Sequence, residues 1–507
     1  MASQKTKQSS RKNRLEKTAL AIIIAGMLIR IIFASFYHPS GDACYHFSVS
    51  RFIEENKVLP FWEQFGRDEP FWAPPLFHII IASVYGIFIW FGKSVAEFAI
   101  KFASPLFSSA TLVLVYITAR KLYGEKKAVW AVFFMAFLPL SMDYGIFGYV
   151  DGMLSFLAML SIYFIANNRI VLSSITAGLA VLTKYNGAFI IPVLIYFAWK
   201  KSRKDKRVVE EGSFNFKKAA FCIIIISAAI GSIWFIRNWE LLGNPVWPFF
   251  NNVFKGYNAN SFENSGVGEV SIKNLFDYRL ITTLYLGIFG IPDGNINSLS
   301  FVKLPYMNIL LFGWIAATIL FLIPALFGIK KQDNKVLYLW IGSFAVLAAF
   351  YAINASFAVS RFALPAFPAI AMIWANGMAE GINKIPIKKV LTVMIVLIAA
   401  GFVVLEAVKI RIASNEWERY ETDFKWIKEN TPKNSVFLGG QCLSYNIDRQ
   451  TYHFREESVK NADYIFINRK FKIEPRSIMR EGIEDEDKWK QVYYNEETGT
   501  EVYAVRP

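Results

Sequence analysis

The residues with the clearest chemical potential are charged side chains at the ends of apolar segments, where a polar substrate could reach them. The stretch after the first apolar segment opens with Gly41 and Asp42 and closes with a Glu-Pro and Pro-Pro sequence that starts at Glu69. A carboxylate at the edge of a membrane is partly desolvated, which tunes its pKa while leaving it accessible. The ionisable residues placed in this way are Asp42, Glu69, His78, Asp151, Lys184, Arg237 and Arg361.

These residue types suit a reaction in which a phosphate is held while another group loses a proton. Arginine grips phosphate oxygens through its guanidinium fork, lysine supplies a point charge, and a carboxylate can accept the proton. The sequence contains no Walker loop, dinucleotide-binding fingerprint or nucleophilic-serine elbow, which disfavours a nucleotide substrate. The alternative is that Lys184, Arg237 and Arg361 are interface anchors. Their predicted outer position runs against the charge bias of the chain and favours a functional role.

The composition indicates a membrane protein with many spans. Hydrophobic residues make up 54% of the 507 residues and charged residues only 19%, whereas soluble proteins carry about 25% charged residues. The net charge of +15 would indicate a nucleic-acid partner in a soluble chain, but most basic residues lie in short loops between apolar segments. The charge therefore reports membrane topology, and we expect no nucleic-acid partner.

Three cysteines, Cys44, Cys222 and Cys442, are widely spaced and form no metal-binding pattern. A disulfide between Cys44 and Cys442 on the outer side is compatible with the topology, but two free cysteines are favoured. The first apolar segment follows basic residues, as in a signal peptide. Because it contains Arg30 and lacks a convincing cleavage site, we predict a retained helix.

The basic residues order the apolar runs across the membrane. Six Lys or Arg residues precede position 18 against Glu16 alone, which places the N-terminus in the cytoplasm. The run 76–91 is expected to lie along the surface or to dip into the membrane without crossing it. The next run, 99–119, then crosses inward and places the basic residues that follow it on the inside. Short amphipathic surface helices are also expected over residues 52–65. Alternation predicts about eleven spans and an external C-terminus. The predicted spans are 18–36, 99–119, 128–147, 153–166, 170–182, 188–199, 219–235, 305–329, 336–352, 362–374 and 390–408.

From residue 410 the composition becomes that of a soluble domain. Apolar residues recur at helical spacing over 415–430, and short strands are predicted at 436–438, 464–468, 491–494 and 501–505. We therefore predict an all-α polytopic membrane domain over residues 1–409, with its first outer loop at about 37–98. A small α/β domain over residues 410–507 would follow outside the membrane.

Several segments, taken in order, resemble the C-type membrane glycosyltransferases (GT-C fold) that use polyprenyl-phosphate sugars. The nearest families are the protein O-mannosyltransferases and the lipid A aminoarabinose transferases. The matching segments are Gly41-Asp42, Glu69-Pro70 to Pro74-Pro75-Leu76, Tyr149-Val150-Asp151-Gly152-Met153-Leu154, Gly178-Leu179-Ala180-Val181-Leu182-Thr183-Lys184, Trp234-Phe235-Ile236-Arg237-Asn238-Trp239 with Gly243-Asn244-Pro245, and Arg361-Phe362-Ala363-Leu364-Pro365.

The resemblance implies a multi-pass, inverting glycosyltransferase that moves a sugar, with mannose favoured, from a polyprenyl or dolichyl phosphate to an acceptor hydroxyl outside the cell membrane. It implies that Asp42 is the catalytic base, with Asp151 supporting it, and that Lys184, Arg237 and Arg361 bind the donor phosphate. One departure concerns the loop. The aminoarabinose enzymes have a lysine directly after the acidic residue of the Glu-Pro stretch, whereas Pro70 follows Glu69 here. Arg67 is the candidate substitute.

The remaining expectations concern the loop, the acceptor and metals. Glu69, His78 and Tyr45 are expected to organise the loop or contact the acceptor, and His78 is expected to pack there rather than bind metal. A monophosphate leaving group among several cations has little need of a metal, so no cofactor is expected to be required, although a divalent metal is left open. The acceptor is either a protein Ser/Thr or a lipid-linked glycan.

Two other functions fit a membrane protein with charges at one face. A transporter or flippase for a lipid-linked or anionic substrate would hold charges between its helices, but it usually shows internal repeats and charges near the middle of the membrane. A scaffold that only presents the C-terminal domain would not need the ordered set of carboxylates and cations. Both alternatives are therefore ranked below the enzyme.

Overall fold

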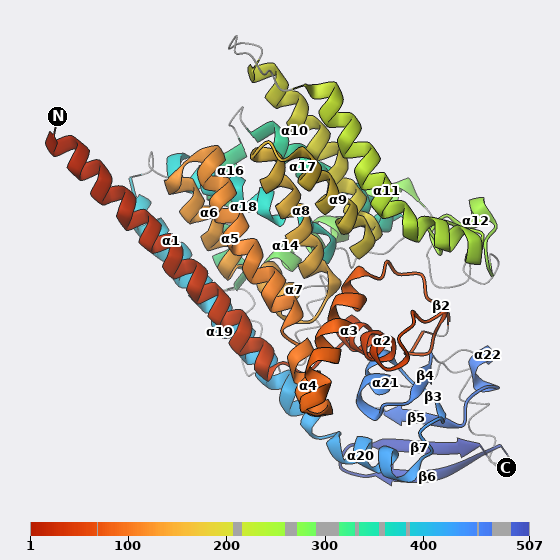
Figure 1. Ribbon diagram of the computed structural model, residues 1–507. Helices are drawn as coiled ribbons and strands as arrows, with labels where there is room; N and C mark the ends of the chain where they lie inside the picture. The colour runs from red at the N-terminus through yellow and green to blue at the C-terminus, as the bar shows by residue number, and fades with distance from the viewer. Residues whose placement is uncertain are drawn as a thin grey trace.

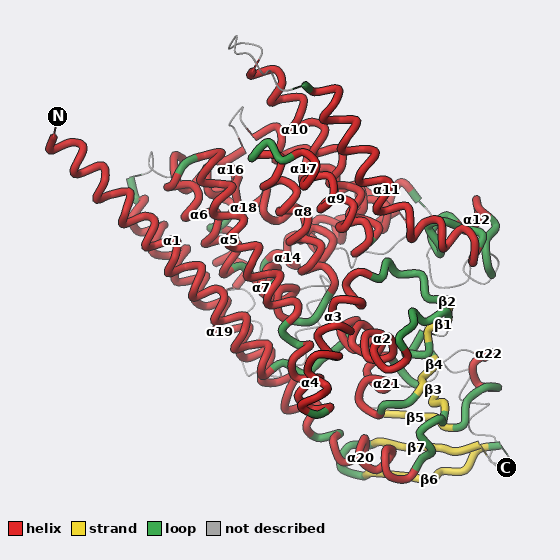
Figure 2. The backbone as a smooth tube through the Cα atoms, viewed as in Figure 1, coloured by secondary structure: helices red, strands yellow, loops and turns green. Residues whose placement is uncertain are grey.

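The computed structural model describes residues 2–67, 69–205, 215–258, 271–290, 314–329, 334–353, 360–381, 386–453, 456–468 and 488–505. Long helices form one bundle, and a small β-sheet from the last part of the chain lies at one end of it (Figure 1). Figure 2 shows the described strands gathered at that same end. The predicted division into a helical membrane part and a C-terminal sheet domain thus matches the architecture.

Among the described residues, six helices are long and apolar enough to cross a membrane. A bent pair, α6 (Glu125–Phe137) and α7 (Pro139–Ile146), raises the number to seven if it is one span. The bend of 56° falls where Pro139 begins α7, because proline cannot continue the hydrogen bonding of the preceding helix. The six helices are Lys12–Phe36, Lys93–Tyr123, Phe216–Leu242, Lys335–Ile353, Ser360–Gly381 and Lys388–Asn415.

These spans belong to named elements of the bundle. They lie in α1 (Ala2–Phe36), α4 (Lys93–Ile100) with α5 (Ala103–Tyr123), α11 (Phe216–Leu242), α17 (Lys335–Ile353), η6 (Ser360–Ala366) with α18 (Phe367–Asn376) and η7 (Gly377–Gly381), and α19 (Lys388–Glu418). Shorter helices fill the interior, namely α8 (Val150–Ala166), α9 (Ile170–Thr183), α10 (Ile190–Asp205), α14 (Tyr278–Ile288) and α16 (Leu322–Ile329). Several are shorter than the roughly 20 residues of a full span. The count of eleven spans and the orientation of the termini therefore stay predictions, and part of the predicted span 305–329 lies outside the described residues.

The first helix contains a buried charge whose hydrogen bonds are all supplied by the protein. Arg30 is fully buried, and its guanidinium donates to the Ser108 hydroxyl at 2.7 Å and to the Met135 and Ala136 carbonyls at 2.9 and 3.0 Å. A buried charge is tolerated when it is hydrogen-bonded in this way. Arg30 thereby connects α1 to α5 and α6, and α19 runs alongside α1 at the edge of the bundle (Figure 1).

The first outer loop differs from its predicted structure. Helix α2 begins at Asp42, ten residues before the predicted start, and ends at Asn56. The next residue, Lys57, takes a left-handed conformation that ends the helix. Beyond it, β1 (Trp62–Glu63) pairs antiparallel with β2 (Glu69–Pro70). The prediction of surface helices over 52–65 is therefore wrong after Asn56, because Pro60 disfavours continued helix and the hairpin takes over. The hairpin is followed by α3 (Leu76–Phe88), η1 (Ile89–Phe91) and α4, and the surface placement of 76–91 stays a prediction.

The C-terminal domain is built on a five-stranded sheet of order β4-β3-β5-β7-β6. Its members are β3 (Val436–Leu438), β4 (Gln450–Tyr452), β5 (Tyr464–Asn468), β6 (Trp489–Asn495) and β7 (Thr500–Val505). The parallel pairs are β3 with β4 and β3 with β5, and the antiparallel pairs are β5 with β7 and β6 with β7. Four predicted strands are confirmed, and the prediction missed β4 and α21 (Gln441–Ile447).

The helix predicted over 415–430 is two helices. Membrane helix α19 extends to Glu418, and α20 (Glu421–Asn430) begins after a two-residue break. Tyr420, Phe424 and Ile427 do share a buried face, as their spacing predicts, and they pack under the sheet against Phe437 and Phe466. The predicted domain boundary at residue 410 falls inside α19, so the membrane helix continues without interruption towards the sheet domain.

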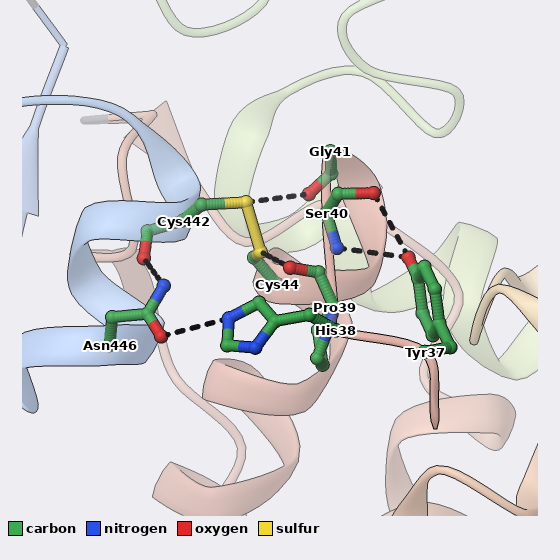
Figure 3. Close-up of a disulfide and its surroundings, with 8 residues drawn as sticks. All are labelled: Tyr37, His38, Pro39, Ser40, Gly41, Cys44, Cys442 and Asn446. Carbon is green, nitrogen blue, oxygen red and sulfur yellow. Dashed lines mark hydrogen bonds between the residues drawn. A yellow bond between two sulfur atoms is a disulfide. The ribbon is translucent and has the colours of Figure 1, made fainter. Parts of the chain in front are cut away.

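The expectation that Cys44 and Cys442 are free is wrong. The two residues form a disulfide between the first turn of α2 and the first turn of α21 (Figure 3). Their sequence separation of 398 residues hid the pairing, because a long loop gives no local signal of which cysteines meet. Cys222 in α11 is the free cysteine. The bond attaches the C-terminal domain to the outer loop.

The predicted topology can be tested with thiol labelling. Lys217 and Lys425 are both exposed, and the predicted topology puts Lys217 inside and Lys425 outside. In a Cys222→Ser background, we expect an impermeant maleimide added to intact cells to label Lys425→Cys and to spare Lys217→Cys. Lysed cells should show both labelled. Labelling of both positions in intact cells would contradict the predicted orientation.

Candidate active site

A cavity of about 380 Å³ lies where the outer loop meets the ends of the bundle helices. Six of the nine predicted site residues line it, namely Asp42, Tyr45, Arg67, His78, Lys184 and Arg361. The other three lie behind this lining. Glu69 and Asp151 contact Arg67 and Lys184, and Arg237 contacts the backbone of the outer loop. The fold thus brings together charges that are more than 300 positions apart in the chain.

The backbone at Gly41 places Asp42 at the cavity. Gly41 has φ 55° and ψ −132°, a combination essentially restricted to glycine, and a Cβ there would approach the Tyr149 hydroxyl to 2.7 Å. This turn makes Asp42 the first residue of α2. A carboxylate at a helix N-terminus is favoured by the helix dipole. In the Gly-Asp pair, Gly41 therefore forms the turn that starts α2, and Asp42 is the first residue of that helix and lines the cavity.

Two cations hold the Asp42 carboxylate. Arg361 Nη1 donates to Oδ2 at 2.5 Å, and Arg67 Nη2 lies 3.6 Å from Oδ1. Burial by itself would raise the pKa of Asp42, but the charges of Arg361 and Arg67 outweigh burial and hold the pKa below its ordinary value. Asp42 is therefore ionised at neutral pH. Its side chain remains 26% exposed, so an acceptor can reach it.

Arg67 stands at the centre of an acidic and aromatic cluster. Its guanidinium lies 3.9 Å from a carboxylate oxygen of Glu63 and 3.9 Å from one of Glu69, and 3.9 Å above the Tyr45 ring. The Tyr45 hydroxyl donates to Glu63 Oε1 at 2.5 Å. Burial raises the pKa of Glu63 to about 8. The sequence prediction missed Glu63, since a lone acid between aromatic residues carries no recognisable motif.

Lys184 and Asp151 form a second ion pair beside the first. Lys184 sits at the break between α9 and η2 (Tyr185–Phe189), and its Nζ donates to Asp151 Oδ1 at 2.7 Å. The Lys184 side chain is 24% exposed in the cavity wall, whereas Asp151 is fully buried in the first turn of α8. Asp151 can therefore orient Lys184, and its buried position agrees with a supporting rather than a proton-accepting role.

Arg237 is hydrogen-bonded to the backbone of the outer loop in this structure. Its Nη1 donates to the Phe71 carbonyl at 2.5 Å and to the Asn238 side chain at 2.7 Å. The next carbonyl, that of Trp72, accepts hydrogen bonds from Tyr185, Trp234 and Asn238. These bonds join the end of α11 to the Glu-Pro stretch. Arg237 is not among the residues that line the cavity, so its contact with a donor phosphate stays a prediction.

Two histidines form the floor next to Asp42. His46 Nδ1 and His78 Nε2 are 2.9 Å apart, and both rings are buried. Burial, with His78 adding to it, lowers the pKa of His46 well below its ordinary value, so the ring is neutral. Within the ranges that the structure describes, no group of three or more His, Cys, Asp or Glu side chains is arranged to hold a metal ion. His78 packs against Tyr45, His46 and Phe71.

The cavity also has an apolar wall, which comes from four separate parts of the chain. It consists of Phe189, Val246, Phe249, Phe250, Val346, Leu347, Phe350, Tyr351 and Phe362. An elongated apolar group can lie against this wall while a charged head group meets the cations. The cavity therefore combines a carboxylate that is ionised, cations that remain partly accessible, and a surface suited to a hydrocarbon chain.

Comparison with known proteins finds one family model that matches part of the chain. Residues 72–234 match the family model described as dolichyl-phosphate-mannose-protein mannosyltransferase. The match includes Asp151 and Lys184 and stops short of Asp42 on one side and Arg361 on the other. No curated protein matches the chain in sequence.

Solved structures match over nearly the whole chain. The apo oligosaccharyltransferase of Archaeoglobus fulgidus superposes with a TM-score of 0.55 at 12% identity, covering 96% of this chain and 74% of that one. The archaeal oligosaccharyltransferase AglB from Archaeoglobus fulgidus, in complex with an inhibitory peptide and a dolichol-phosphate, gives a TM-score of 0.53 at 14% identity, with coverage of 96% and 74%. ArnT from Cupriavidus metallidurans bound to undecaprenyl phosphate gives 0.51 at 13% identity, with coverage of 96% and 97%. At these identities the likeness concerns the fold.

Proposed function

We propose that this chain, which has the fold of the C-type membrane glycosyltransferases, transfers a glycosyl group from a polyprenyl phosphate to an acceptor hydroxyl. The observation that carries the proposal is the cavity in which Asp42, Arg361, Arg67 and Lys184 converge beside an apolar wall. The matched family is described by its dolichyl-phosphate-mannose donor, and two neighbours were solved with dolichol-phosphate and undecaprenyl phosphate. The family description and the two bound lipid phosphates support a lipid-phosphate donor for this chain.

The donor would lie with its isoprenoid chain along the apolar wall and its phosphate between Arg361 and Lys184. Both cations are already paired, Arg361 with Asp42 and Lys184 with Asp151. A phosphate that enters between them adds charge-assisted hydrogen bonds without requiring a new cation. It also draws part of the positive charge away from Asp42. Since that charge holds the pKa of Asp42 low, donor binding would make Asp42 a stronger base.

The transfer itself is a direct displacement. The acceptor oxygen forms a bond to the anomeric carbon as its proton moves to Asp42, and the bond between that carbon and the phosphate oxygen breaks. The electron pair of the broken bond stays on the phosphate, where the cations stabilise the developing charge. One displacement inverts the configuration at the anomeric carbon, by the geometry that distinguishes inverting from retaining glycosidases. We expect no metal to be required.

The finer assignments follow from the matched family. Mannose is the proposed sugar because the family description names dolichyl-phosphate mannose. A protein Ser/Thr hydroxyl is the first candidate acceptor, and a lipid-linked glycan hydroxyl is the second. The predicted topology places the reaction outside, because Asp42 follows the first span. The Cys44–Cys442 disulfide also attaches the loop that carries Asp42 to the C-terminal domain, which is predicted to be external.

The direct test uses purified protein, dolichyl-phosphate mannose and a chelator. We expect release of dolichyl phosphate and attachment of mannose to a Ser/Thr peptide or to a lipid-linked glycan, whichever is the acceptor, with no loss of activity when divalent metals are removed. Parallel reactions with dolichyl-phosphate glucose would identify the sugar. Transfer across vesicle membranes without release of the lipid phosphate would instead identify a flippase and refute the proposal.

A further inference from the structure

The C-terminal domain reaches the candidate base through two consecutive residues at the start of α21. Cys442 forms the disulfide with Cys44, two positions after Asp42 (Figure 3). The neighbouring side chain, Gln441, lies between Gly41 and Arg67. With its amide oxygen facing Arg67, it accepts a hydrogen bond from Nε at 3.0 Å and donates to the Gly41 carbonyl at 3.3 Å. A residue of the external domain thereby touches both the turn that presents Asp42 and the cation beside it.

The same domain also holds the backbone of the hairpin that carries Arg67. Phe65 forms a parallel β-bridge with Thr451 of β4, and the Gly66 amide donates to the Thr451 carbonyl at 2.7 Å. The Thr451 amide donates to the Gln64 carbonyl at 2.9 Å. Gly66 has φ 91°, and a Cβ there would lie 2.5 Å from the backbone nitrogen of Gln441. This close approach is possible because residue 66 is glycine.

Gln441 gives Arg67 a hydrogen bond that the carboxylates around Arg67 do not give. The three nearby carboxylate oxygens lie 3.6 to 3.9 Å from the guanidinium, beyond hydrogen-bond distance. Among the described partners, Gln441 is the one at hydrogen-bond distance from Nε. The Tyr45 ring lies against one face of the guanidinium, and the hydrogen bond from Nε to Gln441 limits the rotation of the guanidinium over that ring.

We propose that Gln441 of the C-terminal domain is a positioning residue that fixes Arg67, and through Arg67 and Gly41 sets the orientation and charge environment of Asp42. The inference rests on the proposed function, in which Asp42 is the base. It assigns the C-terminal domain a part in the chemistry of the membrane domain. The disulfide keeps Gln441 in register with the turn, and the β-bridge keeps the hairpin against the domain.

The test depends on the charged and titratable groups around Asp42, which come from every neighbouring element. They are His46 of α2, Glu63, Arg67 and Glu69 of the hairpin, Tyr149 and Asp151 at the start of α8, Lys184 between α9 and η2, and Arg361 of η6. Of these, Arg67 is the group that Gln441 contacts directly. If Arg67 swings away, Asp42 loses a nearby positive charge and its pKa rises. Because Asp42 acts deprotonated, activity would then be lost at a higher pH as the solution is acidified.

The variant Gln441→Leu removes both hydrogen bonds at similar size. We expect kcat to fall about ten- to hundredfold, because small misplacements of active-site groups lower rates by such factors. We also expect the acid limb of the pH–rate profile to move to higher pH. Gln441→Glu keeps an acceptor for Arg67 Nε and should recover most of the rate. Retention of the Cys44–Cys442 disulfide on non-reducing gels would show that the domain is still docked.

Asn446→Ala is the matched control. Asn446 also lies on α21, but its Oδ1 accepts a hydrogen bond from His38 Nε2 at 3.2 Å, and its Nδ2 donates to the Cys442 carbonyl at 2.8 Å (Figure 3). It should lower thermal stability without moving the pH–rate profile. An unchanged profile in Gln441→Leu, or the same shift in Asn446→Ala, would overturn the positioning role.

A second readout separates this inference from the proposed function. Carbodiimide couples to protonated carboxyl groups, so the pH dependence of Asp42 labelling, read by mass spectrometry, follows its protonation without turnover. We expect the labelling midpoint to rise in Gln441→Leu and to stay at the wild-type pH in Asn446→Ala. If wild-type protein transfers no sugar but the midpoint shifts, the function fails and the positioning stands. If sugar is transferred but neither profile shifts, the positioning fails alone.

Discussion

Replacing Asp42 by Asn is expected to lower sugar transfer by about 10²–10⁴-fold, the usual cost of losing a general base. The amide has nearly the same shape, so α2 should still start at this residue, and the donor phosphate should still meet Arg361 and Lys184. The amide cannot accept the proton of the acceptor hydroxyl at neutral pH. Release of lipid phosphate from a labelled donor measures the rate, and donor binding is measured separately.

Asp151→Asn is the comparison for this variant. Asp151 is buried and hydrogen-bonded to Lys184, so its loss disturbs a cation rather than the base. We expect a smaller loss of rate than in Asp42→Asn, together with altered donor binding. Normal turnover by Asp42→Asn would exclude Asp42 as the base and move the assignment to a carboxylate of the Arg67 cluster behind the cavity lining, Glu63 or Glu69.

Replacing Arg361 by Ala is expected to lower the rate about 10²–10³-fold. This is the usual effect of removing a group that stabilises charge in a transition state. Arg361 is the cation that pairs most closely with Asp42 and also lines the cavity where the phosphate would lie. The Ala variant should bind polyprenyl phosphate more weakly than wild type. Arg361→Lys keeps the charge but loses the fork geometry of the guanidinium, so its loss of rate should be intermediate.

Arg237→Ala serves as the matched arginine control. Arg237 bonds to the Phe71 carbonyl and does not line the cavity, so we expect its loss to loosen the outer loop with a smaller effect on phosphate binding. Polyprenyl-phosphate binding that is weakened equally by both variants would place Arg237 in the phosphate site. Wild-type binding and turnover in Arg361→Ala would remove Arg361 from that site.

Much of this protein could be predicted from local patterns. Apolar runs specify membrane helices wherever they lie, because each helix satisfies its own backbone hydrogen bonds in lipid. Period-two and period-3.6 patterns identified four strands of the C-terminal sheet and the buried face of α20. The placement of Asp42, Lys184 and Arg361 at the ends of apolar segments also predicted that they would meet, since the ends of spans on one side of a membrane share a single layer.

The tertiary structure decided what depends on contacts between distant segments. The Cys44–Cys442 disulfide, the short strand β4 and the contact of Gln441 with Arg67 all join the outer loop to a domain about 400 residues later, and nothing local encodes them. Arg237 looked equivalent to Arg361 in sequence, yet one bonds a loop carbonyl and the other bonds Asp42. A span end specifies the depth of a side chain in the membrane, whereas its direction and partner are set by how the helices pack.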